Sequence, residues 1–276
     1  MTQSALVCGR CGSEALPEAT FCYNCGGSLA YTSATYTAGR APWTIKDIGK
    51  AIAVVITALV VTSIPASLIA LAIAGGEDIE QDPAALTVAL GASLFLELAM
   101  LLSAVYFSVR KYGVPWAVLG LRRPAKGGFW LTLGVAVGLV IVALMINFAY
   151  FAALGAVGVH PDTSIEEIFQ SAGPLVMLFV LSLVFAPLME EVFFRGFVFG
   201  GLRGRWGVAW AAVASGLLFS VAHIGNPGTI YLIPPVAAIG AVFAWGYAYT
   251  DSLLTSWLAH FLFNLIAFAS GVAQYS

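Results

Sequence analysis

The sequence predicts an all-α polytopic membrane protein with about seven transmembrane helices and a small N-terminal zinc ribbon. Composition gives the first reason, since 60% of the 276 residues are hydrophobic and only 9% are charged. A soluble domain cannot hydrate its surface with so few charges, so lipid must cover much of the chain. The second reason is that all four cysteines lie within the first 25 residues. The net charge of −2 argues neither for nor against nucleic acid, and no nucleic-acid partner is expected.

Residues 1–30 are the first predicted element, a cytoplasmic zinc ribbon. It contains two Cys-x-x-Cys pairs, each followed by glycine, as a tight turn around a metal requires: Cys8, Cys11, Cys22 and Cys25. Four thiolates would hold a structural Zn²⁺, whose binding would fold a segment too short to build its own core. Two disulfides are the alternative, which a reducing cytoplasm disfavours. The segment resembles the short zinc ribbons fused to many bacterial membrane proteins, so we expect a structural role or a cytoplasmic partner.

Residues 31–47 are expected to be a linker and residues 48–276 the transmembrane domain. No apolar signal-peptide region precedes them, so the first span is expected to act as an uncleaved anchor. The apolar stretches Ala51–Ala74 and Phe129–Val159 reach or exceed the roughly 20 residues that cross the hydrocarbon core as a helix. The spans are expected at about residues 50–74, 84–109, 129–156, 174–200, 207–225, 230–249 and 252–272.

Charges alternate between the connections. Cations precede the first expected span and follow the second: Arg40, Lys46, Lys50, Arg110, Lys111, Arg122, Arg123 and Lys126. Arg203 and Arg205 mark a further turn on that side, and the opposite connections, near residues 77–82 and 162–167, carry only acidic charges. Because cytoplasmic connections are enriched in Lys and Arg, the N-terminus is expected to be cytoplasmic, in a bacterial cytoplasmic membrane.

Three charged residues interrupt an otherwise apolar segment: Glu190, Glu191 and Arg195. Each ionised residue at the centre of a span costs about 2.5–3.5 kcal/mol on insertion scales, so pairing or hydration must offset the cost. Glu191 and Arg195 are four residues apart, on one helix face, where they can pair. Glu190 points about 100° away and can face another partner. Pro187 removes a backbone hydrogen bond one turn earlier and can open the helix there.

Two later segments carry polar residues at helical spacing: Phe219 with His223, and His260 with Asn264. The rise of about 1.5 Å per residue brings Glu190, His223, His260 and Asn264 to overlapping depths in the membrane. We therefore expect these four side chains to meet. Glu97, in the middle of the second expected span, is either a helix-to-helix hydrogen-bond partner or a lining residue of a water cavity.

The order Glu-Glu-x-x-x-Arg, Phe-x-x-x-His and His-x-x-x-Asn resembles the CAAX protease and bacteriocin-processing family of intramembrane proteases. The resemblance covers about residues 170–270, the expected protease-like core. It implies an intramembrane endopeptidase that hydrolyses a peptide bond in a membrane-associated protein or peptide. Eukaryotic members trim the residues after a prenylated cysteine, but the composition and the fused ribbon look bacterial, where prenylated substrates are not expected.

The family pattern implies a role for each motif residue. Glu190 and His223 would activate the attacking water. His260 and Asn264, which have N–H donors, would stabilise the oxyanion. Three residues would support this site by pairing or packing: Glu191, Arg195 and Phe219.

Alternatives stay open. Glu190, His223 and His260 could instead supply the two-His, one-carboxylate zinc site of a metalloprotease. The metal-free glutamate mechanism is preferred, because the Glu-Glu motif lacks a second His at i+4 and Asn264 is a poor zinc ligand. A non-catalytic membrane scaffold or immunity protein, whose ribbon recruits a partner, is the alternative function. A transporter would predict inverted repeats, which we do not find in the sequence.

Overall fold

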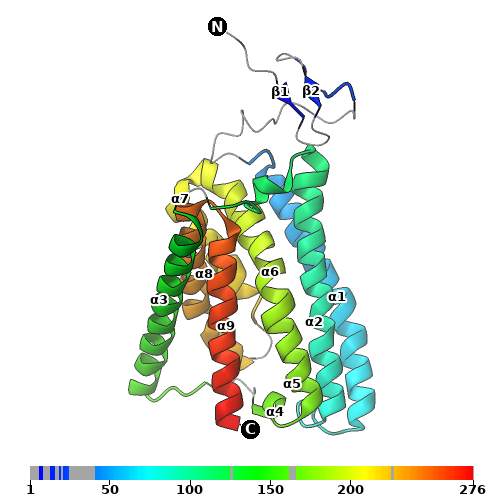
Figure 1. Ribbon diagram of the computed structural model, residues 1–276. Helices are drawn as coiled ribbons and strands as arrows, with labels where there is room; N and C mark the ends of the chain where they lie inside the picture. Colours follow the sequence, from blue (N-terminus) through cyan, green and yellow to red (C-terminus); the bar gives the residue numbers. More distant parts are fainter. Residues whose placement is uncertain are drawn as a thin grey trace.

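The computed structural model describes residues 6–8, 13–15, 19, 21–24, 41–124, 127–161, 166–224 and 227–275. From residue 41 onwards the described chain is a bundle of helices (Figure 1). Six helices in this part are long and apolar enough to cross a membrane: Ile45–Ala74, Pro83–Arg110, Gly128–Ala156, Ala172–Val221, Thr229–Thr250 and Leu253–Tyr275. The all-α class is therefore confirmed for this part, whereas the prediction of about seven spans is wrong.

The difference in number arises where two expected spans, 174–200 and 207–225, form one helical run. The run comprises α5 (Ala172–Phe179), η3 (Val180–Phe185), α6 (Ala186–Glu190), η4 (Glu191–Phe199) and α7 (Gly200–Val221). A straight helix of 50 residues would be about 75 Å long, more than twice the hydrocarbon thickness. The run instead folds back on itself. This is seen in a hydrogen bond of 2.8 Å that Ser215 Oγ donates to the carbonyl of Phe194, 21 residues earlier. Gly207 adopts φ 77° and ψ 169°, which changes the direction of the chain without a loop.

Side-chain caps fix the starts of the first two helices. α1 (Ile45–Ala74) begins with a capping box, in which Thr44 and Asp47 each bond the other's backbone N–H. α2 (Pro83–Val105) is capped by Asp82, whose carboxylate accepts from a backbone N–H of the first turn. The two helices lie side by side at one edge of the bundle (Figure 1). The most apolar window of α1 is not buried, which leaves its surface available to lipid.

The remaining elements complete the bundle: η1 (Tyr106–Arg110), η2 (Trp116–Leu119), α3 (Gly128–Ala156), α4 (Glu166–Phe169), η5 (Pro227–Leu232), α8 (Ile233–Thr250) and α9 (Leu253–Tyr275). Helix α7 packs closely on α8, and α3 packs on both α8 and α9. A side chain could not fit between α7 and α8, because a Cβ atom at Gly216 would lie 2.3 Å from the carbonyl oxygen of Ala237. Small residues thus let two helix backbones approach directly.

Aromatic side chains fill the core behind η4. Trp43 is fully buried ahead of α1, and its indole N–H donates a 2.9 Å hydrogen bond to the carbonyl of Phe197. Its ring also stacks on the Phe197 ring, with centroids 5.5 Å apart. On the other side, Phe199 meets Tyr247 of α8 edge to face at 5.8 Å. These contacts fix η4, and with it the carboxylates at its start.

Ion pairs gather at the end of the bundle where α1 begins and where α8 is connected to α9. Asp251, between α8 and α9, pairs with Arg122 and Arg203. Asp47 pairs with Lys111, and this hydrogen bond raises the pKa of the Lys111 ammonium. Lys111, Arg122 and Arg203, which the sequence groups on one side, therefore lie at one end of the bundle.

The N-terminal segment contains a short antiparallel hairpin of β1 (Leu6–Val7) and β2 (Glu14–Ala15). Cys8 follows β1 directly, and its N–H donates to the Ser13 carbonyl at 2.8 Å. Cys8 and Cys22 are both buried. Cys11, Cys25 and most of the expected linker lie outside the described residues, so the zinc ribbon stays a prediction.

Candidate active site

The polar cluster lies where α6 meets η4, inside the bundle. Glu190 ends α6 and Glu191 begins the π-helical η4, one turn after Pro187. The side chains of Glu190, Glu191 and Arg195 are buried, with relative exposures of 6%, 1% and 0%. Pro187 has no backbone N–H, so this position near the start of α6 has no donor that needs a hydrogen-bond partner. The wider π-helical turns of η4 follow α6 directly.

One cavity of about 380 Å³ collects the four residues that were expected to meet. Glu190 contributes from α6, His223 from the end of α7, and His260 and Asn264 from α9. Apolar side chains surround them, among them Leu178 and Phe268. The expected meeting of these four residues is confirmed, whereas their chemical roles stay predictions.

His260 lies between the two adjacent carboxylates. Its Nδ1 is 3.1 Å from Oε1 of Glu191, and its Nε2 is 3.7 Å from Oε2 of Glu190. Phe219 meets the imidazole edge to face at 5.7 Å, and Phe243 lies at 5.9 Å. Contact with Glu191 therefore orients the ring so that its other nitrogen faces Glu190.

The expected ion pair between Glu191 and Arg195 is present, with Oε1 and Nη1 2.9 Å apart. Nη2 of Arg195 also donates to the carbonyl of Gly240 at 3.3 Å. The guanidinium lies 4.3 Å from the centroid of the Phe219 ring, close enough for a cation–π contact. Phe219 thus touches both Arg195 and His260, which places this motif residue in direct contact with the cluster.

His223 and Asn264 are each held by a backbone carbonyl. Nδ1 of His223 lies 2.8 Å from the carbonyl of Phe219, so this nitrogen carries a hydrogen and donates it to that oxygen. The amide of Asn264 donates a 2.9 Å hydrogen bond to the carbonyl of Ser182 in η3. One amide hydrogen of Asn264 remains for a second acceptor.

Glu97 joins this site from α2, which the motifs do not include. It is 7% exposed, lines the same cavity, and its carboxyl group lies within hydrogen-bonding reach of the carboxyl group of Glu190. The sequence signals this residue only as an acid in the middle of an apolar span. The interpretation of Glu97 as a lining residue of a cavity is confirmed by this placement, and the helix-to-helix hydrogen bond stays a prediction.

Residues 172–266 match the family of Rce1-like type II CAAX prenyl endopeptidases. The chain is also 29% identical over 161 residues to the membrane-embedded CAAX protease MroQ of Staphylococcus aureus strain USA300. This alignment spans 56% of the chain and 57% of MroQ. An alignment with the putative membrane peptidase YdiL of Bacillus subtilis strain 168 has 26% identity, over 32% of the chain and 34% of YdiL. No solved structure matches the chain significantly.

These similarities and the six apolar helices identify an integral membrane protein with a CAAX-protease-like segment. The matched segment contains all three motifs, from Glu190 to Asn264. Glu97, α1, α3 and the cysteine segment lie outside it.

The contacts of the two histidines are also relevant to the alternative of a catalytic zinc site. Within the described ranges, no group of three or more His, Cys, Asp or Glu side chains is arranged to hold a metal ion. His223 directs Nδ1 to a carbonyl of its own helix, and His260 directs Nδ1 to Glu191. Both rings thus use Nδ1 for contacts within the protein, and the metal-free mechanism stays a prediction.

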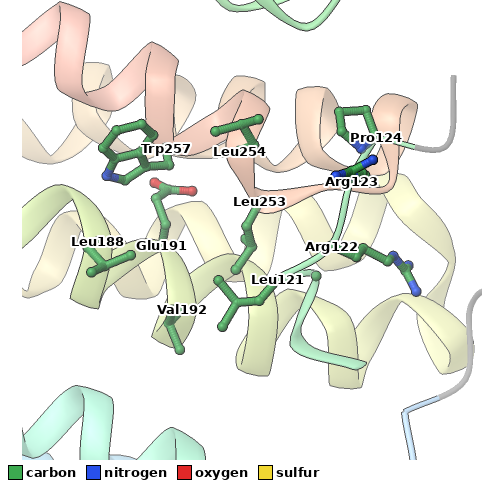
Figure 2. Close-up of a pocket in the computed structure, with 11 residues that line it drawn as sticks. Leu121, Arg122, Arg123, Pro124, Leu188, Glu191, Val192, Leu253, Leu254 and Trp257 are labelled. Atoms are coloured by element: carbon green, nitrogen blue, oxygen red, sulfur yellow. The ribbon is translucent and has the colours of Figure 1, made fainter. Parts of the chain in front are cut away.

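A second cavity, of about 660 Å³, is lined by Leu188 of α6 and by Glu191 and Val192 of η4. Figure 2 shows the Glu191 carboxylate beside Trp257 and Leu188, with Arg122 and Arg123 at the other end of the cavity. Glu190 and Glu191 thus open onto different cavities, as the 100° step between adjacent helical residues requires.

Proposed function

We propose that the protein is an intramembrane endopeptidase that hydrolyses a peptide bond in a membrane-associated protein or peptide. The single observation that carries this proposal is the cavity of about 380 Å³ lined by Glu190, His223, His260 and Asn264. Peptide hydrolysis needs a base for water, donors for an oxyanion and a proton for the leaving amine. These four residues supply all three functions. The similarity to MroQ, whose name describes a membrane-embedded CAAX protease, supports the same chemistry.

In the proposed mechanism, Glu190 takes a proton from water while the water oxygen attacks the peptide carbonyl carbon. The lone pair on Nε2 of His223 helps to orient that water. His260, with both nitrogens protonated, donates from Nδ1 to Glu191 and from Nε2 into the cavity. His260 and Asn264 thereby stabilise the developing oxyanion. Glu190 then transfers its proton to the leaving nitrogen as the C–N bond breaks, which restores the carboxylate.

The N-terminal segment is proposed to be a cytoplasmic ribbon that binds one structural Zn²⁺ through Cys8, Cys11, Cys22 and Cys25. The hairpin whose first strand directly precedes Cys8 and the burial of Cys8 and Cys22 support this proposal. Lys46 and Lys50 follow this segment in the sequence at the start of the first span, which supports a cytoplasmic N-terminus. A cytoplasmic partner would bind the ribbon without altering the cavity.

Mass spectrometry of protein termini in cells tests the proposed function. Membranes of cells that express the wild-type protein are compared with membranes of cells that express Glu190→Gln or the control Glu80→Gln, which changes an exposed acid. We expect new termini within or beside membrane anchors in the wild type and the control, and their loss in Glu190→Gln. Identical termini in all three would contradict the proposal.

A further inference from the structure

Glu97 brings a third carboxyl group to the candidate site from a helix outside the matched segment. It lies on α2, lines the cavity that contains Glu190, and its carboxyl group is within hydrogen-bonding reach of that of Glu190. Helix α2 packs directly on α6, so the contact is part of the helix interface rather than of an exposed loop. Figure 1 shows α2 beside the α5–α6 segment.

Hydrogen bonding requires a proton between these two groups. If both were ionised, Oε2 of Glu97 and Oε2 of Glu190 would have no hydrogen-bond donor among the described residues. A buried acceptor without a donor costs about 1–3 kcal/mol, and more when the group is charged. One proton on either carboxyl group supplies the missing donor to the other. Two adjacent carboxyl groups away from water also resist simultaneous ionisation.

The charges around the cavity lead to the same conclusion. The titratable groups that surround Glu97 and Glu190 are Glu191, Arg195, His223 and His260. Glu191 and Arg195 pair with each other. His223 and His260 use Nδ1 for a backbone carbonyl and for Glu191, respectively. Because Arg195 already pairs with Glu191, ionised Glu97 and ionised Glu190 would place two further negative charges side by side in an apolar surrounding, and a shared proton removes one of them.

We propose that Glu97 and Glu190 form a carboxyl pair that shares one proton, with Glu97 as the residue that positions Glu190. This inference rests on the proposed function. Protonated Glu97 donates its O–H to the Glu190 carboxylate and fixes the orientation of the other Glu190 oxygen toward water. Glu190 takes one proton from the water and returns it to the leaving nitrogen when the C–N bond breaks. The proton of the pair stays on the pair throughout, so each turnover begins and ends in the same state.

Kinetics separate this role from simple helix packing. Glu97→Leu keeps the approximate size but removes the donor to Glu190, so kcat should fall about 100-fold, the lower end of what a positioned acid or base contributes. KM should change little, since no contact to the substrate is removed. Glu97→Gln, which keeps a donor, should recover part of kcat, and the control Glu80→Gln should match the wild type. A wild-type kcat in Glu97→Leu, or a loss confined to KM, would overturn the pair.

Infrared spectroscopy tests the pair without any substrate. In the wild type at neutral pH, one protonated carboxyl group should give a C=O stretching band, which Glu97→Gln removes and Glu80→Gln leaves unchanged. In Glu190→Gln the band should shift, because its hydrogen-bond acceptor changes. Absence of the band in the wild type, or a band that survives in Glu97→Gln, would overturn the pair. If no protein cleaves any peptide while the band behaves as expected, the proposed function fails and the shared proton stands.

Discussion

Glu190 and Glu191 are neighbours in the sequence but have different surroundings. Glu191 contacts Arg195 and His260, whereas Glu190 faces the cavity and Glu97. The difference follows from the 100° step between adjacent residues of a helix, so it could be predicted from the sequence alone. The first carboxylate is thus available for chemistry, and the second is committed to its partners.

The buried pair of Glu191 and Arg195 gives a prediction at the residue scale. Arg195→Met should destabilise the protein by about 3–5 kcal/mol, because it leaves the Glu191 carboxylate without its cation. The double variant with Glu191→Gln should lose less than the sum of the two single variants. Unfolding free energies measured in detergent would give this coupling. Additivity of the two changes within about 0.5 kcal/mol would contradict the pairing.

Most residues of the site could be predicted from the sequence, and there is a physical reason why some of their contacts could not. Spacing places His260 and Asn264 on one face of a helix, so the motifs predict which residues meet. Spacing does not fix how α2 lies against α6, so the contact of Glu97 with Glu190 could not be predicted. The contact of His260 with Glu191 likewise depends on the packing of two helices.

At the scale of elements, the contact between α7 and α8 positions His223. Gly216→Ala should destabilise the protein by about 1–3 kcal/mol, because the new Cβ would meet the backbone of α8 and force the helices apart. Gly134→Ala in α3 is the matched control, since a Cβ there meets no atom within 4 Å. Thermal unfolding in detergent would compare them. Equal stability of Gly216→Ala and the wild type would contradict the close approach.

The N-terminal segment gives a second prediction for an element. The purified wild-type protein should contain about one zinc per chain, as a four-thiolate site holds. Cys8→Ser should lower the zinc content, measured by mass spectrometry of the metal, and should leave peptide cleavage by intact membranes unchanged. A full zinc content in Cys8→Ser would show that this cysteine is not a ligand.

The positions of most helices could be predicted because each needs an apolar stretch of about 20 residues. The π-helical turns η3 and η4 could not, since they use the same apolar residues as the α-helices around them. The change of direction at Gly207 could not be predicted either, because a single glycine inside an apolar run does not reveal its backbone angles.

At the scale of the whole molecule, helices from separate parts of the sequence surround one cavity. α2, α6, α7 and α9 all contribute residues to the site, while α1 lies at the edge. Composition predicts such a bundle in a membrane but does not determine which helices are neighbours. The cavity contains charged side chains among apolar ones, where electrostatic contacts are stronger than in water.

The central claim is that Glu190 performs peptide hydrolysis inside this cavity. The most direct test is the initial rate at which the purified protein, reconstituted in lipid, cleaves membrane-anchored peptides, compared between the wild type and the nearly isosteric Glu190→Gln. We predict cleavage by the wild type and a rate at least about 100-fold lower in Glu190→Gln, with both proteins equally folded. Cleavage by Glu190→Gln at the wild-type rate would contradict the account.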